Sequence, residues 1–211
     1  MPTHAVLFDF NGTLSHDEPL LCRIYRELFA EHGRPISERF YYERLSGLAE
    51  TAIAEACLGA GDQRIAAFVR ERIERYLAAA DGSTIPAHVR EAVRVAGGRA
   101  RLAVVSGAAR VEIARVVAAA GLDDVLGTIV ADDDVAEGKP HPESYLLACA
   151  RLGVAPAAAL ALEDTEAGVA AARAAGARVV AVVGTQPHDR LAAADEIVER
   201  LDAATIRRLL A

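Results

Sequence analysis

The sequence predicts an α/β fold: a doubly wound parallel sheet with a small helical subdomain inserted after the first strand. Two observations lead to this fold class. Short apolar runs alternate with helical stretches along most of the chain, a pattern typical of a parallel sheet whose two faces are both covered by helices. The alternation is absent from residues 15–81, where no run suggests a strand and the segments look helical.

Five segments are expected to form the strands, because each is a short and nearly continuous apolar run. They are His4–Phe10, Leu102–Ser106, Thr128–Ala131, Ala159–Glu163 and Val179–Val183. Four stretches between them are expected to be helices, namely Ala87–Ala96, Val111–Ala120, Glu143–Leu152 and Ala167–Ala175. Gly121, Gly153 and Gly176 stand just after helical stretches, where a left-handed C-cap commonly ends a helix.

Residues 15–81 are expected to form a small helical cap. Three stretches in it look helical, Pro19–His32, Glu38–Leu58 and Gln63–Ala80, and turn-forming residues flank the whole segment. We therefore expect two domains: an α/β core made of residues 1–14 and 82–211, and a cap made of residues 15–81.

The composition excludes several classes of function. The chain of 211 residues has a formal net charge of −7, which does not suit a nucleic-acid partner with its many phosphates. No apolar run reaches the roughly 18 residues of a membrane span, and the N-terminus lacks a secretory signal pattern. Cys22, Cys57 and Cys149 are far apart and are expected to be buried thiols. We expect a soluble, cytoplasmic protein without nucleic-acid or membrane partners, and the sequence leaves its oligomeric state open.

Polar residues follow four of the predicted strands where each strand ends. Asp9, Asn11, Gly12 and Thr13 follow the first, Ser106 and Gly107 the second, Lys139 lies in the loop after the third, and Glu163 and Asp164 follow the fourth. The carboxyl ends of parallel strands meet at one edge of the sheet, where ligands bind. These residues supply a nucleophile, oxygen ligands for a hard cation and a positive charge for a phosphate.

Each of these residues alone has a structural explanation. Ser106 can cap the next helix, Lys139 can lie in a solvated loop, and Glu163 and Asp164 can be acids in the first turn of a helix. Their coincidence at four successive strand ends favours a site. Lys139 is also the only lysine among 23 basic residues, which suggests that its position requires a compact charge rather than a planar guanidinium.

Four segments resemble the motifs of the haloacid dehalogenase-like (HAD) hydrolase superfamily. The sequence DFNGTL after the first strand resembles DxDGT, and VVSG resembles the second motif, a strand ending in Ser or Thr. GKPHPESY resembles GKPxPDxY, and LEDTEAGVAAARAAG resembles EDSxxGxxAAxxAG. The helical insertion matches the cap of the phosphoglycolate phosphatase and β-phosphoglucomutase-like branch. The resemblance covers about residues 4–184 and implies a Rossmann-like core with this cap.

The resemblance implies catalytic roles for four residues. Asp9 attacks phosphorus and forms an aspartyl phosphate. Ser106 binds a phosphoryl oxygen, and Lys139 neutralises the phosphate and holds Asp9 in place. Asn11 stands where phosphatases of the family have the aspartate that protonates the leaving group and then activates water.

The resemblance also implies a magnesium site. Mg²⁺ is expected between Asp9, the backbone carbonyl of Asn11 and Asp164. Glu163 is expected either to bind the ion directly or to support its ligands. Six oxygens including waters suit this ion.

The expected partner is a small phosphorylated metabolite. Gly12 lets the backbone turn close to the phosphate, and Thr13 and Gly107 are expected to contact the substrate beside it. Arg44 of the cap is a candidate for substrate selection, with a place on a solvated helix face as the alternative.

Position 11 is the main departure from the family pattern, because the amide of Asn11 cannot exchange a proton near neutral pH. General acid–base help is typically worth about 10²–10⁴-fold, so ordinary phosphoester hydrolysis should be slow. We expect a Mg²⁺-dependent phosphatase with weakened acid–base catalysis. Three alternatives stay open: a substrate whose leaving group needs no proton, such as an acyl phosphate, a catalytically impaired protein that binds a phosphorylated metabolite, and a non-phosphatase relative such as a dehalogenase.

Overall fold

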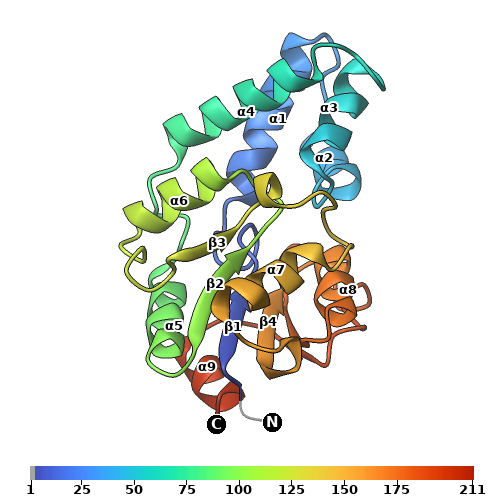
Figure 1. Ribbon diagram of the computed structural model, residues 1–211. Helices are drawn as coiled ribbons and strands as arrows, with labels where there is room; N and C mark the ends of the chain where they lie inside the picture. The colour runs from blue at the N-terminus through green and yellow to red at the C-terminus, as the bar shows by residue number, and fades with distance from the viewer. Residues whose placement is uncertain (1–2) are drawn as a thin grey trace. The chain divides into compact units, whose positions relative to one another are not determined.

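The computed structural model describes residues 3–211 and divides the chain into two units (Figure 1). The sheet unit comprises the described residues up to His16 together with Asp81–Ala211, and the helical unit is Asp17–Ala80. These junctions lie within two residues of the boundaries expected from the sequence. Within the described part of the chain, no helix is both long and apolar enough to cross a membrane.

The sheet unit is built on one parallel sheet of six strands, in the order β3-β2-β1-β4-β5-β6. The strands are β1 (Ala5–Phe8), β2 (Arg101–Val105), β3 (Thr128–Val130), β4 (Ala159–Glu163), β5 (Arg178–Val182) and β6 (Glu196–Val198). The first five are those expected from the apolar runs. The predicted fold class is therefore confirmed, with β6 as an additional edge strand.

Helices of the sheet unit pack on the strands. Alternate strand residues, among them Leu7 and Ala161, share one buried cluster with α7 (Glu143–Leu152) and α8 (Glu166–Ala174). Helix α5 (Ala87–Gly97) packs against β2 and against α9 (Ala203–Leu209). Helix α6 (Arg110–Ala119) packs against β3, and short 3₁₀ turns span Asp132–Asp134 and Pro156–Ala158.

Three helices of the sheet unit, α6, α7 and α8, end just before the glycines that were expected to cap them. Gly121, Gly153 and Gly176 have φ values of 67°, 64° and 88°, a region that other L-residues rarely adopt. The sequence did not predict β6 or α9. Both are short, and the segment Glu196–Val198 offers no apolar run of the length that identified the other strands.

The helical unit contains α1 (Glu18–Glu31), α2 (Glu38–Arg44), α3 (Glu50–Leu58) and α4 (Ile65–Ala79). Helix α1 packs against α2 and α4, and α3 packs against α4. The expectation of one continuous helical stretch over Glu38–Leu58 was wrong. The chain breaks between α2 and α3 because Gly47 takes a φ of 83°, which a helix cannot accommodate.

Several polar groups are buried inside the helical unit. Arg72 forms an ion pair with Glu50, with Nε 2.9 Å from Oε2. Tyr76 donates a hydrogen bond to Asp17. Buried polar groups of this kind need such partners, because an unmet hydrogen bond in the interior is costly.

Candidate active site

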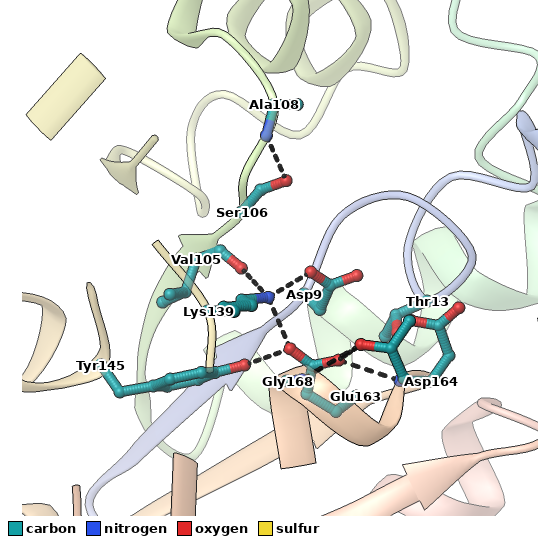
Figure 2. Close-up of polar contacts among 11 residues, drawn as sticks. Asp9, Thr13, Val105, Ser106, Ala108, Lys139, Tyr145, Glu163, Asp164 and Gly168 are labelled. Atoms are coloured by element: carbon teal, nitrogen blue, oxygen red, sulfur yellow. Dashed lines mark hydrogen bonds and ion pairs between the residues drawn. The ribbon is translucent and has the colours of Figure 1, made fainter. Parts of the chain in front are cut away.

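The site lies where the strand order reverses, between β1 and β4. Asp9 directly follows β1, and its backbone N–H donates to the carbonyl of Leu162 in β4 at 2.9 Å. This register sets Asp9 beside Glu163, the last residue of β4. The carboxyl ends of strands at such a reversal form the ligand-binding edge of an open α/β sheet. Figure 2 shows the polar side chains that gather there.

Lys139 joins three of these strand ends. Its ammonium donates to Asp9 Oδ1 and Glu163 Oε1, both at 2.5 Å, and to the carbonyl of Val105 at 3.1 Å (Figure 2). Burial would lower the pKa of Lys139, but the carboxylates of Asp9 and Glu163 outweigh it and raise that pKa. The group therefore stays a cation. Three hydrogens diverging from one nitrogen match these acceptors better than a planar guanidinium would, which gives a physical reason for the lone lysine.

Glu163 is fully engaged by the protein. Its Oε1 accepts from Lys139 and from the Tyr145 hydroxyl at 2.6 Å, and Oε2 accepts from the Asp164 N–H at 3.1 Å and the Thr165 hydroxyl at 3.2 Å. The residue is 0% exposed. With these four hydrogen bonds made, its role in this arrangement is to hold Lys139.

Helix α8 approaches Glu163 through a glycine. A Cβ on Gly168 would lie 1.9–2.1 Å from the carboxylate atoms of Glu163, closer than any real contact. The N-cap of α8, Thr165, accepts a hydrogen bond from the Gly168 N–H at 3.2 Å. Gly168 therefore lets the helix begin directly against the buried carboxylate.

Asp9, Glu163 and Asp164 form a cluster of three buried carboxylates. Ligand oxygens from all three lie within 4.8 Å of one another. Burial raises the pKa of Asp9 to about 7, with Lys139 opposing the rise and Glu163 adding to it. Burial, followed by the charges of Asp9 and Glu163, raises the pKa of Asp164 well above its usual range. One ammonium faces three carboxyl groups, so ionisation of all three would leave the cluster with an excess of negative charge.

The Oδ2 atom of Asp164 is placed to bind a cation. Its Oδ1 accepts from the Thr13 hydroxyl at 3.3 Å. Its Oδ2 is buried and accepts no hydrogen bond of ordinary geometry, although the Thr185 hydroxyl lies beside it and lowers the pKa of Asp164 against the causes that raise it. Carboxylate oxygens of this kind are the ligands that Mg²⁺ prefers, and an added cation would offset the excess negative charge. The residues present therefore fit a magnesium ion.

The turn after Asp9 is shaped by Gly12. Gly12 has a φ of 82°, and a Cβ there would lie 1.9 Å from Asp164 Oδ2 and 2.3 Å from Thr185 Oγ1. Its N–H donates to the carbonyl of Ser15 at 2.7 Å, which closes the turn that holds Asn11. Only glycine fits this position, both for its conformation and for its close approach to Asp164.

The end of β2 carries Ser106 and Gly107. The Ser106 Oγ accepts from the Ala108 N–H at 3.1 Å, so it supports the turn before α6 while its own hydrogen can be donated to a ligand. Gly107 is exposed, and a Cβ there would meet nothing within 4 Å. Space inside the protein therefore does not require glycine at position 107.

The sheet unit thus brings together most of the predicted site residues. Asp9, Thr13, Lys139, Glu163 and Asp164 are in mutual contact or share partners. Arg44 belongs to the helical unit, where it is an exposed residue at the end of α2, and it is not part of this group.

Sequence reasoning missed three contributors. Tyr145 and Gly168 lie inside the GKPHPESY and LEDTEAG segments, so the motifs contained them, but no spacing showed that both contact Glu163. Thr185 follows β5. The rule of inspecting each strand end would have found Thr185 had it been applied to the fifth strand.

Comparisons with known proteins agree with this geometry. A family model described as haloacid dehalogenase-like hydrolase matches residues 3–176. Protein CbbY of Rhodobacter capsulatus is 32% identical, over 99% of this chain and 98% of its own length. Fructose-1-phosphate phosphatase YqaB of Escherichia coli is 31% identical, over 84% of this chain and 95% of its own length. Among solved structures, an aspartate-to-asparagine mutant of CbbY from Rhodobacter sphaeroides, in complex with xylulose 1,5-bisphosphate, is 29% identical with a TM-score of 0.83 and covers 95% of both chains.

Proposed function

The chain belongs to the haloacid dehalogenase-like hydrolase family and to its phosphatase class, and on this premise we propose that it hydrolyses a small phosphorylated metabolite with the help of Mg²⁺. The reaction runs through a covalent phosphoryl group on Asp9. Relatives named for fructose 1-phosphate or solved with xylulose 1,5-bisphosphate support a substrate of similar size that carries a phosphoryl group.

A single observation carries this proposal: one oxygen of Asp9 is fixed by Lys139 within a buried cluster that has two further carboxylates. The hydrogen bond from Lys139 holds Oδ1, so Oδ2 is the oxygen that attacks phosphorus. A carboxylate that attacks phosphorus forms a mixed anhydride, which water then hydrolyses. The charge of Lys139 opposes the effect of burial on the pKa of Asp9 and so favours the ionised form that a nucleophile needs.

The other residues bind and orient the phosphoryl group. Ser106 donates its hydroxyl hydrogen to a phosphoryl oxygen, and the charge of Lys139 offsets part of the phosphate charge. Gly12 and Gly107 let the backbone approach the phosphate closely.

Mg²⁺ would be held by Asp9, Asp164 and the backbone carbonyl of Asn11. When bound, it supplies positive charge next to the phosphoryl oxygens. Thr13 orients Asp164 for this task through its hydrogen bond. Glu163, whose oxygens already accept four hydrogen bonds, acts through Lys139 rather than as a direct ligand.

The second candidate function is a phosphometabolite-binding protein with impaired catalysis. Asn11 favours this alternative, because its carboxamide cannot donate or accept a proton in the reaction. A dehalogenase-type reaction needs no metal site, and the cluster of Asp9, Glu163 and Asp164 argues against it.

Phosphate release distinguishes the two functions. We would measure Mg²⁺-dependent release from a panel of phosphomonoesters and acyl phosphates by the wild type, Asp9→Ala and Asn11→Asp. Turnover by the wild type that is abolished in Asp9→Ala supports the phosphatase. An inert wild type together with an active Asn11→Asp variant supports the binding protein. Equal activity of the wild type and Asp9→Ala would rule out Asp9 as the nucleophile.

A further inference from the structure

We propose that this site hydrolyses acyl phosphates, in which the phosphoryl group is attached to a carboxylate oxygen, in preference to phosphate esters of alcohols. The inference rests on the proposed function and specifies the substrate class. It follows from the hydrogens that the residues in contact with Asp9, Glu163 and Asp164 can offer to a leaving group.

The side-chain hydrogens of Lys139, Tyr145 and Thr13 already form hydrogen bonds within the protein. All three ammonium hydrogens of Lys139 are donated to protein acceptors (Figure 2). The Tyr145 hydroxyl donates to Glu163, and the Thr13 hydroxyl donates to Asp164. None of these groups has a hydrogen in position to leave with a departing alkoxide.

The carboxyl groups of the sheet unit are occupied as well. Asp9 takes part as the nucleophile, with its Oδ1 bound by Lys139, and Asp164 as the proposed ligand of the cation, with its Oδ1 bound by Thr13. Glu163 accepts four hydrogen bonds and so acts as a carboxylate. Asn11, two residues after the nucleophile, is a carboxamide, which has no proton to transfer near neutral pH.

The chemistry of the leaving group decides which substrates such a site can use. When Asp9 attacks the phosphate ester of an alcohol, the bond from phosphorus to the ester oxygen breaks and an alkoxide must leave or be protonated. When Asp9 attacks an acyl phosphate, the group that departs with the electron pair is a carboxylate. Its conjugate acid has a pKa of about 4, so it leaves as a stable anion and needs no proton.

The second half of the proposed reaction is itself the hydrolysis of an acyl phosphate. The intermediate on Asp9 is itself an acyl phosphate. Water attacks its phosphorus, the bond between phosphorus and the Asp9 oxygen breaks, and Asp9 departs as a carboxylate while the proton of water goes to the released phosphate. A site that completes this step without a proton donor is equipped to perform the same kind of displacement on a bound substrate.

The test is the dependence of the rate on the leaving group. With the full-length protein and saturating Mg²⁺, kcat/KM would be measured for aryl phosphates whose phenols span a range of acidity, and for acetyl phosphate. We expect kcat/KM of the wild type to fall steeply as the phenol becomes less acidic. Asn11→Asp should raise kcat/KM for the poorest leaving groups by about 10²–10⁴-fold, far more than it changes kcat/KM for acetyl phosphate.

Asn11→Ala is the matched control, because it removes the carboxamide without adding an acid. It should keep the steep dependence of the wild type. A dependence as shallow in the wild type as in Asn11→Asp would overturn the inference while leaving the phosphatase proposal intact, and so would a wild type that hydrolyses alkyl phosphates faster than acetyl phosphate. Activity that survives in Asp9→Ala would instead overturn the proposed function itself.

Discussion

The two units of the chain differ in how their buried charged side chains are paired. In the helical unit, the guanidinium of Arg72 is matched by the carboxylate of Glu50. In the sheet unit, three carboxylates gather within 4.8 Å, Asp9 among them, and the ammonium of Lys139 contacts two of them. The buried Arg72 therefore has an acidic partner, whereas the carboxyl cluster of the sheet unit has one cation for three acidic groups.

The difference separates structural from functional polar groups. A buried ion pair with its partner in place holds a unit in one arrangement, whereas unmatched like charges cost stability and raise each other's pKa. The raised pKa values of Asp9 and Asp164 have this origin, after burial. Raised pKa values of neighbouring carboxyl groups at the carboxyl ends of strands are typical of a site that binds a ligand of opposite charge.

The largest expected effect on stability comes from breaking the balanced pair. Glu50→Gln removes the carboxylate that pairs with Arg72, whose side chain is 2% exposed. Breaking a buried ion pair costs about 3–5 kcal/mol. The Glu50 side chain is itself 21% exposed, so we expect the lower end of that range, about 3 kcal/mol, measured by denaturant unfolding.

The control for this prediction is the double variant Arg72→Met/Glu50→Gln, which removes both charges and should recover much of the loss. Mg²⁺ binding should be unaltered in both variants. A loss below about 1 kcal/mol in Glu50→Gln would show that groups other than Glu50 compensate the charge of Arg72.

Asp164→Asn should have the opposite effect on the metal-free sheet unit. The substitution removes one of three mutually repelling carboxylates, and the new amide can donate to the neighbouring Thr185 hydroxyl. We expect the metal-free variant to be at least as stable as the wild type. Mg²⁺ at 100 times its Kd should stabilise the wild type by about 2.7 kcal/mol and the variant hardly at all, as measured by thermal unfolding with EDTA or Mg²⁺.

Two outcomes of this experiment would contradict the interpretation that the acidic cluster of the sheet unit is a ligand site. If Asp164→Asn destabilises the metal-free protein, the carboxylate is needed by the fold and the excess charge is not reserved for a ligand. If Mg²⁺ stabilises both proteins equally, the ion binds elsewhere.

Gly168→Ala should cost about 2 kcal/mol, within the usual range for overpacking, because its Cβ would collide with the Glu163 carboxylate at 1.9–2.1 Å. The matched control is Gly97→Ala in α5, where a Cβ would lie 3.5 Å from its nearest neighbours. A glycine replaced by alanine in a helix with room for the methyl group gains about 0.5–1 kcal/mol. Unfolding free energies that change by the same amount in both variants would show that Glu163 can move away.

The parts of the fold that the sequence predicts are those with the densest burial. All four residues of β1 and all five of β4 are buried, so β1 is an uninterrupted apolar run and β4 is one up to its last residue, Glu163. The edge strand β6 has only one buried residue, Val198, and such a strand has no distinctive pattern. The break at Gly47 was missed because the residues on both sides of it have helical patterns.

The candidate site was predictable only where a strand end carries it. Asp9, Glu163 and Asp164 follow apolar runs, and the topology of a parallel sheet brings them to one edge. The contact of Tyr145 with Glu163 joins α7 to β4 across 18 positions of the sequence, and nothing local encodes it. The saturation of Glu163 by four hydrogen bonds likewise depends on the packing of several elements, so the sequence left its role as a ligand open.

The smallest expected effect concerns Glu18, a carboxylate of the helical unit that is bound by hydroxyl groups rather than by a cation. Its Oε2 accepts from the Tyr41 hydroxyl at 2.9 Å and the Ser46 hydroxyl at 3.2 Å. Burial raises the pKa of Glu18, and these two hydrogen bonds only partly oppose the rise. Glu18 therefore resembles Asp9 and Asp164 in that burial raises its pKa.

A carboxyl group whose pKa is raised by folding contributes its full stability below its ordinary pKa of 4.5 and loses it as the pH rises through the pKa in the folded protein. Glu18→Gln keeps an oxygen that accepts both hydrogen bonds and cannot ionise. We expect it to match the wild type at pH 4 and to exceed its unfolding free energy at pH 8 by less than about 1 kcal/mol. A variant less stable than the wild type at pH 8 would show that a positive charge compensates Glu18, and that the helical unit balances even this carboxylate.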